Sequence, residues 1–170
     1  MTTKNSTNWY VLTTRSRHEK KSEEFLKNRG FDVFLPLQKV MRKWIDRKKM
    51  VEVPLFSGYL FIRYDESKRF DVLNTPGIVR FLRYNNMDAT ISDSQVEAIK
   101  MALNEIPDEI NVIDQHFSEG EEIRIKSGPF KGFYGKIIQY NNNRKIMISI
   151  DSIGKSILIE TGKTVVEKID

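Results

Sequence analysis

The sequence predicts an α+β protein in two parts, an antiparallel sheet flanked by helices and then a small five-stranded β-barrel. Helix and strand patterns alternate up to about residue 106, whereas short strands separated by turn residues dominate afterwards. The chain of 170 residues is long enough for one ordinary domain or two small ones. It contains no cysteine, which excludes a disulfide scaffold.

The first part opens with a β-prone run, Trp9 to Leu12. Ser16 and Glu19 have the spacing of a capping box, which predicts a helix that ends at Gly30. Extended segments are expected at 31–35, at 38–55 as two strands around a charged tip, at 58–64 and at 78–82.

Two further helices are expected in this part. Asp65 can cap a short helix that runs to Leu73. Ser92 and Gln95 form a second capping box, ahead of a helix with Val96, Ile99 and Leu103 on one face.

The second part is predicted to be all β. Glycine and asparagine turns separate expected strands at 121–127, 134–140, 144–150, 155–160 and 164–168. Such short strands favour a closed barrel, because closure leaves no free sheet edge. We therefore expect one domain at 1–106, a linker at 107–118 that contains Pro107, and a second domain at 119–170.

The excess of basic over acidic residues is confined to the first part. Residues 1–106 carry 19 Lys and Arg against 13 Asp and Glu, a net +6, whereas residues 107–170 carry 9 against 10, a net −1. Such a bias suits a polyanion or an acidic protein surface, and equally a soluble lysine-rich face.

Motifs for catalysis or for a cofactor are missing. The two histidines, His18 and His116, lie in different parts of the chain, so no metal site is expected. There is no nucleophile elbow and no phosphate-binding glycine loop. The apolar runs are too short for a membrane span, and the start of the chain is polar. We expect a cytoplasmic binding protein, with no enzymatic activity and no cofactor.

Five motifs, in order, resemble the NusG family of transcription elongation factors. They are W-Y-V-L (9–12), P-L-F-S-G-Y-L-F-I (54–62), T-P-G-I-V-R-F-L (75–82), I-S-D-S-Q-V-E-A-I (91–99) and the KOW-like segment 117–137. The second motif is more similar to specialised bacterial paralogues of the RfaH and UpxY type than to housekeeping members. The resemblance implies an N-terminal (NGN) domain and a C-terminal KOW barrel, which together suppress pausing or termination.

The resemblance implies that the first domain binds the clamp helices of the RNA polymerase β′ subunit. Phe56, Tyr59 and Phe61 are the candidate polymerase-binding residues. Tyr59 and Phe61 share one face of their strand, and Leu60 and Ile62 share the other. Both faces are apolar, so the pattern alone favours core packing, and the resemblance favours a partner surface for Tyr59 and Phe61.

Basic residues gather where the first helix is expected to begin. The resemblance implies that Arg15, Arg17, His18 and Lys21 meet the non-template DNA strand of the transcription bubble. A helix N-terminus already favours phosphate, although a solvated helix face is an equal alternative. The hairpin residues Lys39, Arg42, Lys43, Arg47, Lys48 and Lys49 could contact upstream DNA or protect a sheet edge.

The KOW-like part has its own candidate partner site at Ile153 and Lys155. Housekeeping members usually carry a Phe-Gly pair there, which helps bind the factor Rho and a small-subunit ribosomal protein. Here the pair is Ile153-Gly154, which argues against Rho and leaves the ribosomal protein as a candidate partner. A ribosomal-type RNA-binding protein is the alternative function, but the second part lacks the basic charge it would need.

Overall fold

The computed structural model describes residues 8–114, 119–162 and 164–169. The chain divides into two compact units, Met1–Val96 and Glu97–Asp170, and we describe each by itself. The division falls after residue 96, inside the helix α3 (Asp93–Glu105).

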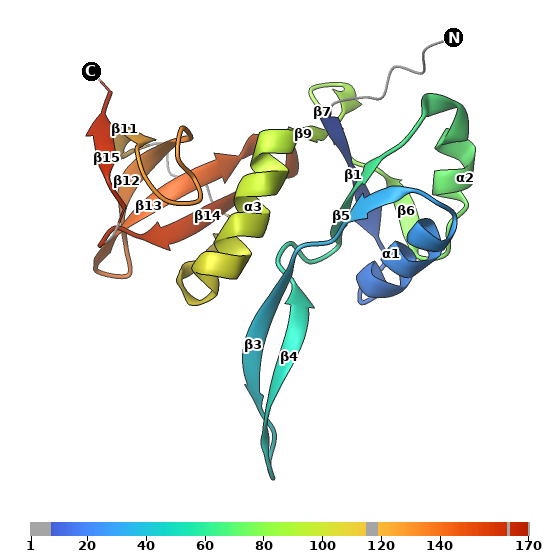
Figure 1. Ribbon diagram of the computed structural model, residues 1–170, viewed down its shortest axis with the longest axis horizontal. Coiled ribbons are helices and arrows are strands. Elements are labelled where there is room, and N and C mark those ends of the chain that lie inside the picture. The colour runs from blue at the N-terminus through green and yellow to red at the C-terminus, as the bar shows by residue number, and fades with distance from the viewer. Residues whose placement is uncertain (1–7, 115–118, 163, 170) are drawn as a thin grey trace. The chain divides into compact units, whose positions relative to one another are not determined.

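A five-stranded antiparallel sheet organises the first unit (Figure 1). The central strand β1 (Asn8–Thr14) pairs with β5 (Tyr59–Arg63), β6 (Ile78–Phe81) and β9 (Thr90–Ser92). The short strand β2 (Asp32–Phe34) pairs with the other edge of β5.

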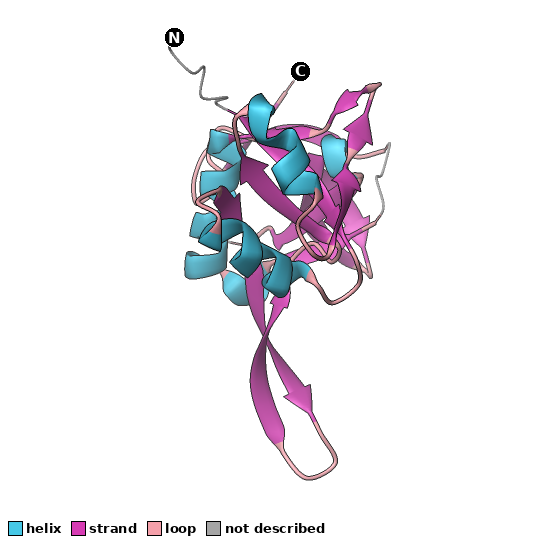
Figure 2. Cartoon of the chain, turned by 90° about the vertical axis from the view of Figure 1, so that its right-hand side faces the viewer, coloured by secondary structure: helices cyan, strands magenta, loops and turns pink. Residues whose placement is uncertain are grey.

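Two helices and two hairpins complete this unit. The helices are α1 (Glu19–Asn28) and α2 (Arg69–Leu73), the latter preceded by a single 3₁₀ turn at Glu66–Lys68. The hairpins are β3 (Leu37–Lys43) with β4 (Lys48–Pro54), and β7 (Arg83–Tyr84) with β8 (Met87–Asp88). The first hairpin is a separate two-stranded sheet that projects from the unit as a ribbon (Figure 2).

The helices α1 and α2 cover one face of the sheet. Leu12, Leu60 and Ile62 point to this face and pack with Leu26 of α1 and Val72 of α2. These side chains are almost fully inaccessible to water, and burying each contributes roughly 1.5–3 kcal/mol to folding. The alternation predicted for 59–62 is therefore confirmed, since Leu60 and Ile62 belong to the helix-covered core.

The second unit is built on one six-stranded antiparallel sheet, in the order β10-β14-β13-β12-β11-β15. The strands are β10 (Asn111–Ile113), β11 (Glu121–Ile125), β12 (Tyr134–Tyr140), β13 (Asn143–Ile150), β14 (Lys155–Glu160) and β15 (Val166–Lys168). Single 3₁₀ turns lie at Pro107–Glu109 and Asp151–Ile153. Gly135 lets β12 approach β13 closely, because a Cβ there would lie 2.7 Å from the carbonyl oxygen of Met147.

All five strands expected in this unit are present, and β10 is an additional one. Within the expected linker 107–118, residues 111–113 pair with β14 through Asn111 opposite Leu158 and Ile113 opposite Ser156. The sequence pattern missed this strand because three residues are too few to show a period of two. Residues 115–118 of the expected linker lie outside the described part of the chain.

One of the two predicted capping boxes is confirmed and the other is wrong. The backbone N–H of Gln95 donates to Oγ of Ser92, and the N–H of Ser92 donates to Oε1 of Gln95, at the start of α3. At α1, however, the N-cap is His18 and makes no capping hydrogen bond through its side chain. Glu19 is buried and bonds instead to the backbone of Gly58, so it cannot reach back to Ser16.

Among the described residues, no helix is both long and apolar enough to cross a membrane.

Candidate nucleic-acid interface

A basic hollow lies where α1 meets the turn before β6. It has a volume of about 430 Å³ and is lined by three cationic or titratable side chains, Arg15, His18 and Lys21. Two exposed apolar residues, Phe25 and Leu73, and the turn Asn74 to Ile78 form the rest of its wall. Cations beside an exposed aromatic ring provide phosphate contacts and a stacking surface together.

The turn is held tightly against the first residues of α1. The backbone N–H of Arg15 donates to the carbonyl of Gly77 at 2.8 Å, and the buried hydroxyl of Ser22 donates to the carbonyl of Pro76 at 2.9 Å. Gly77 has a φ of +86°, and a Cβ there would lie 2.3 Å from Ser22 Oγ and 2.9 Å from His18 Cβ. The floor of the hollow therefore requires glycine at this position.

One ring nitrogen of His18 is engaged by the backbone. Its Nδ1 lies 3.0 Å from the carbonyl oxygen of Ser16, which can only accept, so Nδ1 is the donor and Nε2 is left for another contact. The side chain is exposed, as are those of Arg15 and Lys21. The hollow can thus bind phosphate oxygens and also offer a hydrogen bond to a base edge.

Three of the four predicted DNA-binding residues come together in this hollow. Arg17 is exposed, has a positive φ of 61° and is not among the residues that line the hollow. Phe25 and Leu73, which also line the hollow, were not predicted from the sequence. The sequence could have indicated Phe25, because His18, Lys21 and Phe25 have the helical spacing of three and then four residues that places them on one face.

The sheet face opposite α1 and α2 carries a cluster of aromatic rings. Trp9 lies 6.2 Å from Phe34, Phe34 lies 5.9 Å from Phe61, and Phe61 lies 6.1 Å from Phe56, each between ring centroids. We call these four residues the aromatic face. Phe61 and Phe56 expose 0% and 1% of their surface, whereas Tyr59 is half-buried.

Phe61 therefore packs in the core, which is the alternative that the sequence pattern alone favours. Its ring is enclosed by other side chains, among them Phe34 and Phe56, and the same enclosure removes Phe56 from the surface. Of the three candidate polymerase-binding residues, only Tyr59 retains accessible surface of any extent. The pattern could not reveal this, because Phe34 lies on another strand far away in the sequence.

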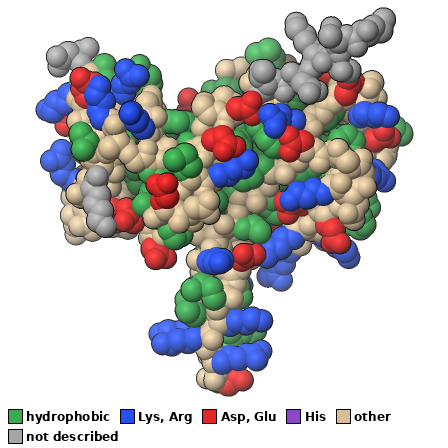
Figure 3. Space-filling model, in the orientation of Figure 1, with side chains coloured by type: hydrophobic (Ala, Val, Ile, Leu, Met, Phe, Trp, Pro, Cys, Tyr) green, Lys and Arg blue, Asp and Glu red, His purple; other side chains and the backbone are tan. Residues whose placement is uncertain are grey.

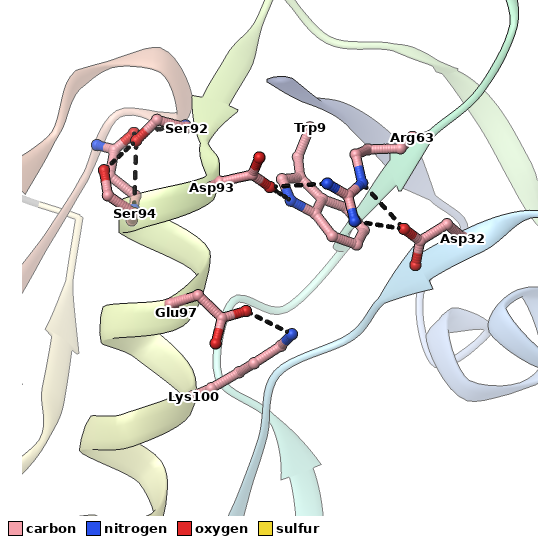
Figure 4. Close-up of polar contacts among 9 residues, drawn as sticks. Trp9, Asp32, Arg63, Ser92, Asp93, Ser94, Glu97 and Lys100 are labelled. Atoms are coloured by element: carbon pink, nitrogen blue, oxygen red, sulfur yellow. Dashed lines mark hydrogen bonds and ion pairs between the residues drawn. The ribbon is translucent and has the colours of Figure 1, made fainter. Parts of the chain in front are cut away.

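A polar network closes one side of the aromatic face (Figure 4). The guanidinium of Arg63 lies 4.5 Å from the ring centroid of Trp9 and binds Asp93 at 2.9 Å and Asp32 at 2.7 Å. The indole N–H of Trp9 donates to the same Asp93 oxygen at 2.8 Å. Asp93 is the first residue of α3, so three strands and the start of this helix are tied together.

A second network holds α2 in place. Arg69 donates to Asp88 at 2.6 Å and to the hydroxyl of Tyr64 at 3.0 Å, and its guanidinium lies 4.1 Å from the ring centroid of Phe81. The hydrogen bond to Asp88 raises the pKa of Arg69, and burial raises the pKa of Tyr64 above its ordinary value. Arg69 is thus engaged within the unit, while the neighbouring Phe70 is 76% exposed.

The predicted partner site in the second unit, Ile153 and Lys155, stays a prediction, and the structure shows where its two residues lie. Ile153 is 5% exposed, because the 3₁₀ turn that contains it ends at Gly154 in the left-handed conformation, with φ of +64°. Lys155 forms an ion pair with Asp114, next to the unexpected strand β10.

Within the described ranges, no three His, Asp or Glu side chains are grouped so that they could hold a metal ion. The exposed cations and the Phe25 ring of the hollow have the chemistry for phosphate contacts and base stacking.

Comparisons with known proteins identify the family. The family model "Transcription termination factor nusG" matches residues 7–100, and the model "KOW motif" matches residues 119–149. The first match covers more than half of the chain, and the chain belongs to the NusG family. This confirms the resemblance and the predicted fold class.

Curated relatives match almost the whole chain. The "Transcription termination/antitermination protein NusG" of Borreliella burgdorferi is 28% identical over 180 residues, covering 95% of this chain and 98% of the relative. The protein of the same name from Halalkalibacterium halodurans is 25% identical over 175 residues, with the same coverage. Among solved structures, "Domain interaction in Thermotoga maritima NusG" matches with a TM-score of 0.58 and 22% identity, over 96% of this chain and 97% of that one.

Proposed function

We propose that this protein is a transcription elongation and antitermination factor that binds RNA polymerase and contacts the non-template DNA strand. The family and the names of the curated relatives support the general role in termination and antitermination. The polymerase and DNA contacts are proposed from the residues of the first unit.

The β′ clamp helices of the polymerase would bind the side of the sheet that carries the aromatic face. Tyr59 supplies the accessible ring, on the same strand face as the buried Phe61. A factor that binds the closed clamp more tightly than the relaxed clamp lowers the population of the relaxed, paused state. This differential affinity is the proposed mechanism of pause suppression.

The non-template strand would be held by the basic hollow. Arg15 and Lys21 neutralise phosphates, His18 offers Nε2 to a base edge, and Phe25 provides a ring for stacking. Few phosphates are involved, so free DNA should bind weakly and in a salt-dependent way. The DNA contact therefore depends on polymerase to bring the strand to the hollow.

One observation supports this proposal more strongly than any other. Arg15, His18 and Lys21 come from two segments of the chain, the end of β1 and the start of α1, and converge on one hollow beside Phe25. A lysine-rich solvated face would not require a glycine turn fixed against it by two hydrogen bonds.

The first test is co-migration with RNA polymerase. Purified protein, treated with ribonuclease, should co-elute with core polymerase in gel filtration, and Tyr59→Ala should weaken the interaction about tenfold or more. Tyr134→Ala, which removes an exposed tyrosine of the second unit, is the matched control. Co-elution that is lost on ribonuclease treatment would favour the alternative, a ribosomal-type RNA-binding protein.

A further inference from the structure

An apolar cavity lies in the second unit, between the end of α3 and the loop that follows β11. Its volume is about 320 Å³, which is in the range of small-molecule sites. The buried side chains of Ile125, Phe130 and Ile159 form its floor, and the half-buried Ile106 continues the apolar surface outward. The cavity shares no residue with the basic hollow or the aromatic face, so the proposed function leaves it unused.

The loop that forms one wall of the cavity is held by its own hydrogen bonds. The N–H of Gly132 donates to the carbonyl of Ile125 at 2.8 Å, and the N–H of Phe133 donates to the carbonyl of Phe130 at 3.0 Å. The ring of Phe130 also packs edge-on against that of Phe133, with 5.9 Å between their centroids. The wall is therefore formed before any ligand binds, and these backbone groups are already engaged with one another.

The described residues that line the cavity include two carboxylates and no cation. Glu105 is the last residue of α3, and Glu109 is the last residue of the 3₁₀ turn that follows. Within the described part of the chain, neither carboxylate forms an ion pair. In Figure 3, Asp and Glu side chains lie on the surface around the lower end of α3. A cation would therefore find two unneutralised acceptors beside an apolar surface.

The chemistry of the lining favours a linear aliphatic amine. Charge complementarity calls for a cation, and the apolar floor calls for methylene groups next to it. The hydroxyl of Ser127, which also lines the cavity, already accepts the N–H of Val165 at 2.9 Å. A peptide would bring amide groups that need partners on this wall, whereas an alkyl amine brings only ammonium groups and methylenes.

We propose that this cavity binds a small linear diamine or polyamine. Its methylene chain lies against Ile106 and Phe130, and its ammonium groups pair with Glu105 and Glu109. The site does not depend on polymerase or DNA, so it can be tested on the isolated protein. Its failure would leave the proposed polymerase and DNA contacts unaffected.

The test titrates the isotope-labelled full chain with three diamines of equal charge and increasing length: diaminopropane, diaminobutane and diaminopentane. Calorimetry gives each affinity, and the amide resonances of Gly128 and Phe130 report the place of binding. Contact with the apolar floor should raise the affinity about two- to fourfold for each added methylene. Magnesium ions at the same concentration should not displace the diamine, because they gain nothing from an apolar surface.

Substitution of the two carboxylates tests the ion pairs. Glu105→Gln with Glu109→Gln should weaken the binding of diaminopentane about fivefold. The charge-matched control is Glu24→Gln with Glu66→Gln in the first unit, where both carboxylates are exposed. The control should bind as the parent does. Melting temperatures measured in parallel show whether either variant has lost stability.

Four results would overturn the proposal. An affinity that does not rise with chain length, or that magnesium ions abolish, would indicate ordinary attraction of counterions to exposed carboxylates. Equal weakening in the site variant and the control would indicate the same. Resonance shifts confined to residues away from the cavity would place the amine elsewhere. A response to a lysine-containing peptide, with none to any diamine, would assign the cavity to a protein partner.

Discussion

The carboxylate of Glu19, in the first turn of α1, accepts a hydrogen bond of 2.8 Å from the backbone N–H of Gly58, in the loop before β5. Glu19 is 6% exposed, and Gly58 has a φ of +82°. The loop that contains Phe56 and leads into Tyr59 is thereby attached to the same helix turn that lines the basic hollow. The two proposed contact regions of the first unit share one structural support.

Removing this acceptor should destabilise the protein. Glu19→Ala leaves the partly buried N–H of Gly58 without its partner, which costs about 1–3 kcal/mol of unfolding free energy. Glu19→Gln keeps an acceptor oxygen and should cost less than half as much. Urea unfolding of both variants measures the difference, and equal losses would show that the hydrogen bond is not what stabilises the loop.

Asp93 should be the residue on which the polar network of Trp9, Arg63 and Asp32 depends most. In Asp93→Ala, the buried indole N–H of Trp9 and the guanidinium of Arg63 both lose an acceptor, at a cost of about 1–3 kcal/mol. Asp93→Asn retains one acceptor oxygen for the indole and should be milder. Thermal unfolding and the fluorescence of Trp9 report the effect. A stable Asp93→Ala protein with unchanged fluorescence would contradict the network's role.

The strand β10 should stabilise the second unit when that unit is prepared alone. A fragment of residues 97–170 contains β10 and Asp114, the ion-pair partner of Lys155, whereas a fragment of residues 119–170 contains neither. The longer fragment should unfold at a higher urea concentration. Identical midpoints would mean that residues 107–118 are only a linker, as the sequence pattern indicated.

Stability in acid should depend on Asp65. Hydrogen bonds from Ser67 hold the pKa of this N-cap carboxylate below its ordinary value. A lowered folded-state pKa stabilises the protein above the unfolded-state pKa, and this contribution is lost as pH falls through the folded-state pKa. Asp65→Asn keeps a neutral capping oxygen, so the difference in melting temperature from the parent should shrink on acidification. A difference that is constant from neutral to strongly acidic pH would contradict this.

The sequence predicted most strands because they are long or strongly β-prone, such as β5, β12 and β13. It failed where contacts between distant segments decide the outcome. Ser16 and Glu19 have the correct spacing for a capping box, but Glu19 bonds to Gly58, 39 residues away. For Phe61 the pattern favours core packing and the resemblance a partner surface, and the ring of Phe34 on β2, which packs against Phe61, could not be foreseen from the sequence. Ile153 lies in a turn, but the left-handed Gly154 after it directs the chain so that Ile153 is buried.

The candidate site was predicted only in part, because contacts between distant segments complete it as well. Arg15, His18 and Lys21 are close in sequence, so local charge alone grouped them. The wall that makes the hollow, Leu73 to Ile78, lies more than 50 residues further along the chain, and the packing of Gly77 on Ser22 brings it there. Short-range patterns carry no information about such a contact.

The central claim is that the basic hollow holds the non-template strand of a transcribing polymerase. It is tested most directly by crosslinking paused complexes that contain thio-labelled non-template DNA, with pause lifetimes measured on the same template. Arg15→Ala, His18→Ala and Lys21→Ala, combined in one protein, should abolish the crosslink and most pause suppression, while polymerase binding persists. The charge-matched variant Arg144→Ala with Lys168→Ala should behave as the parent. Crosslinking and pause suppression that both survive the triple substitution would contradict the account.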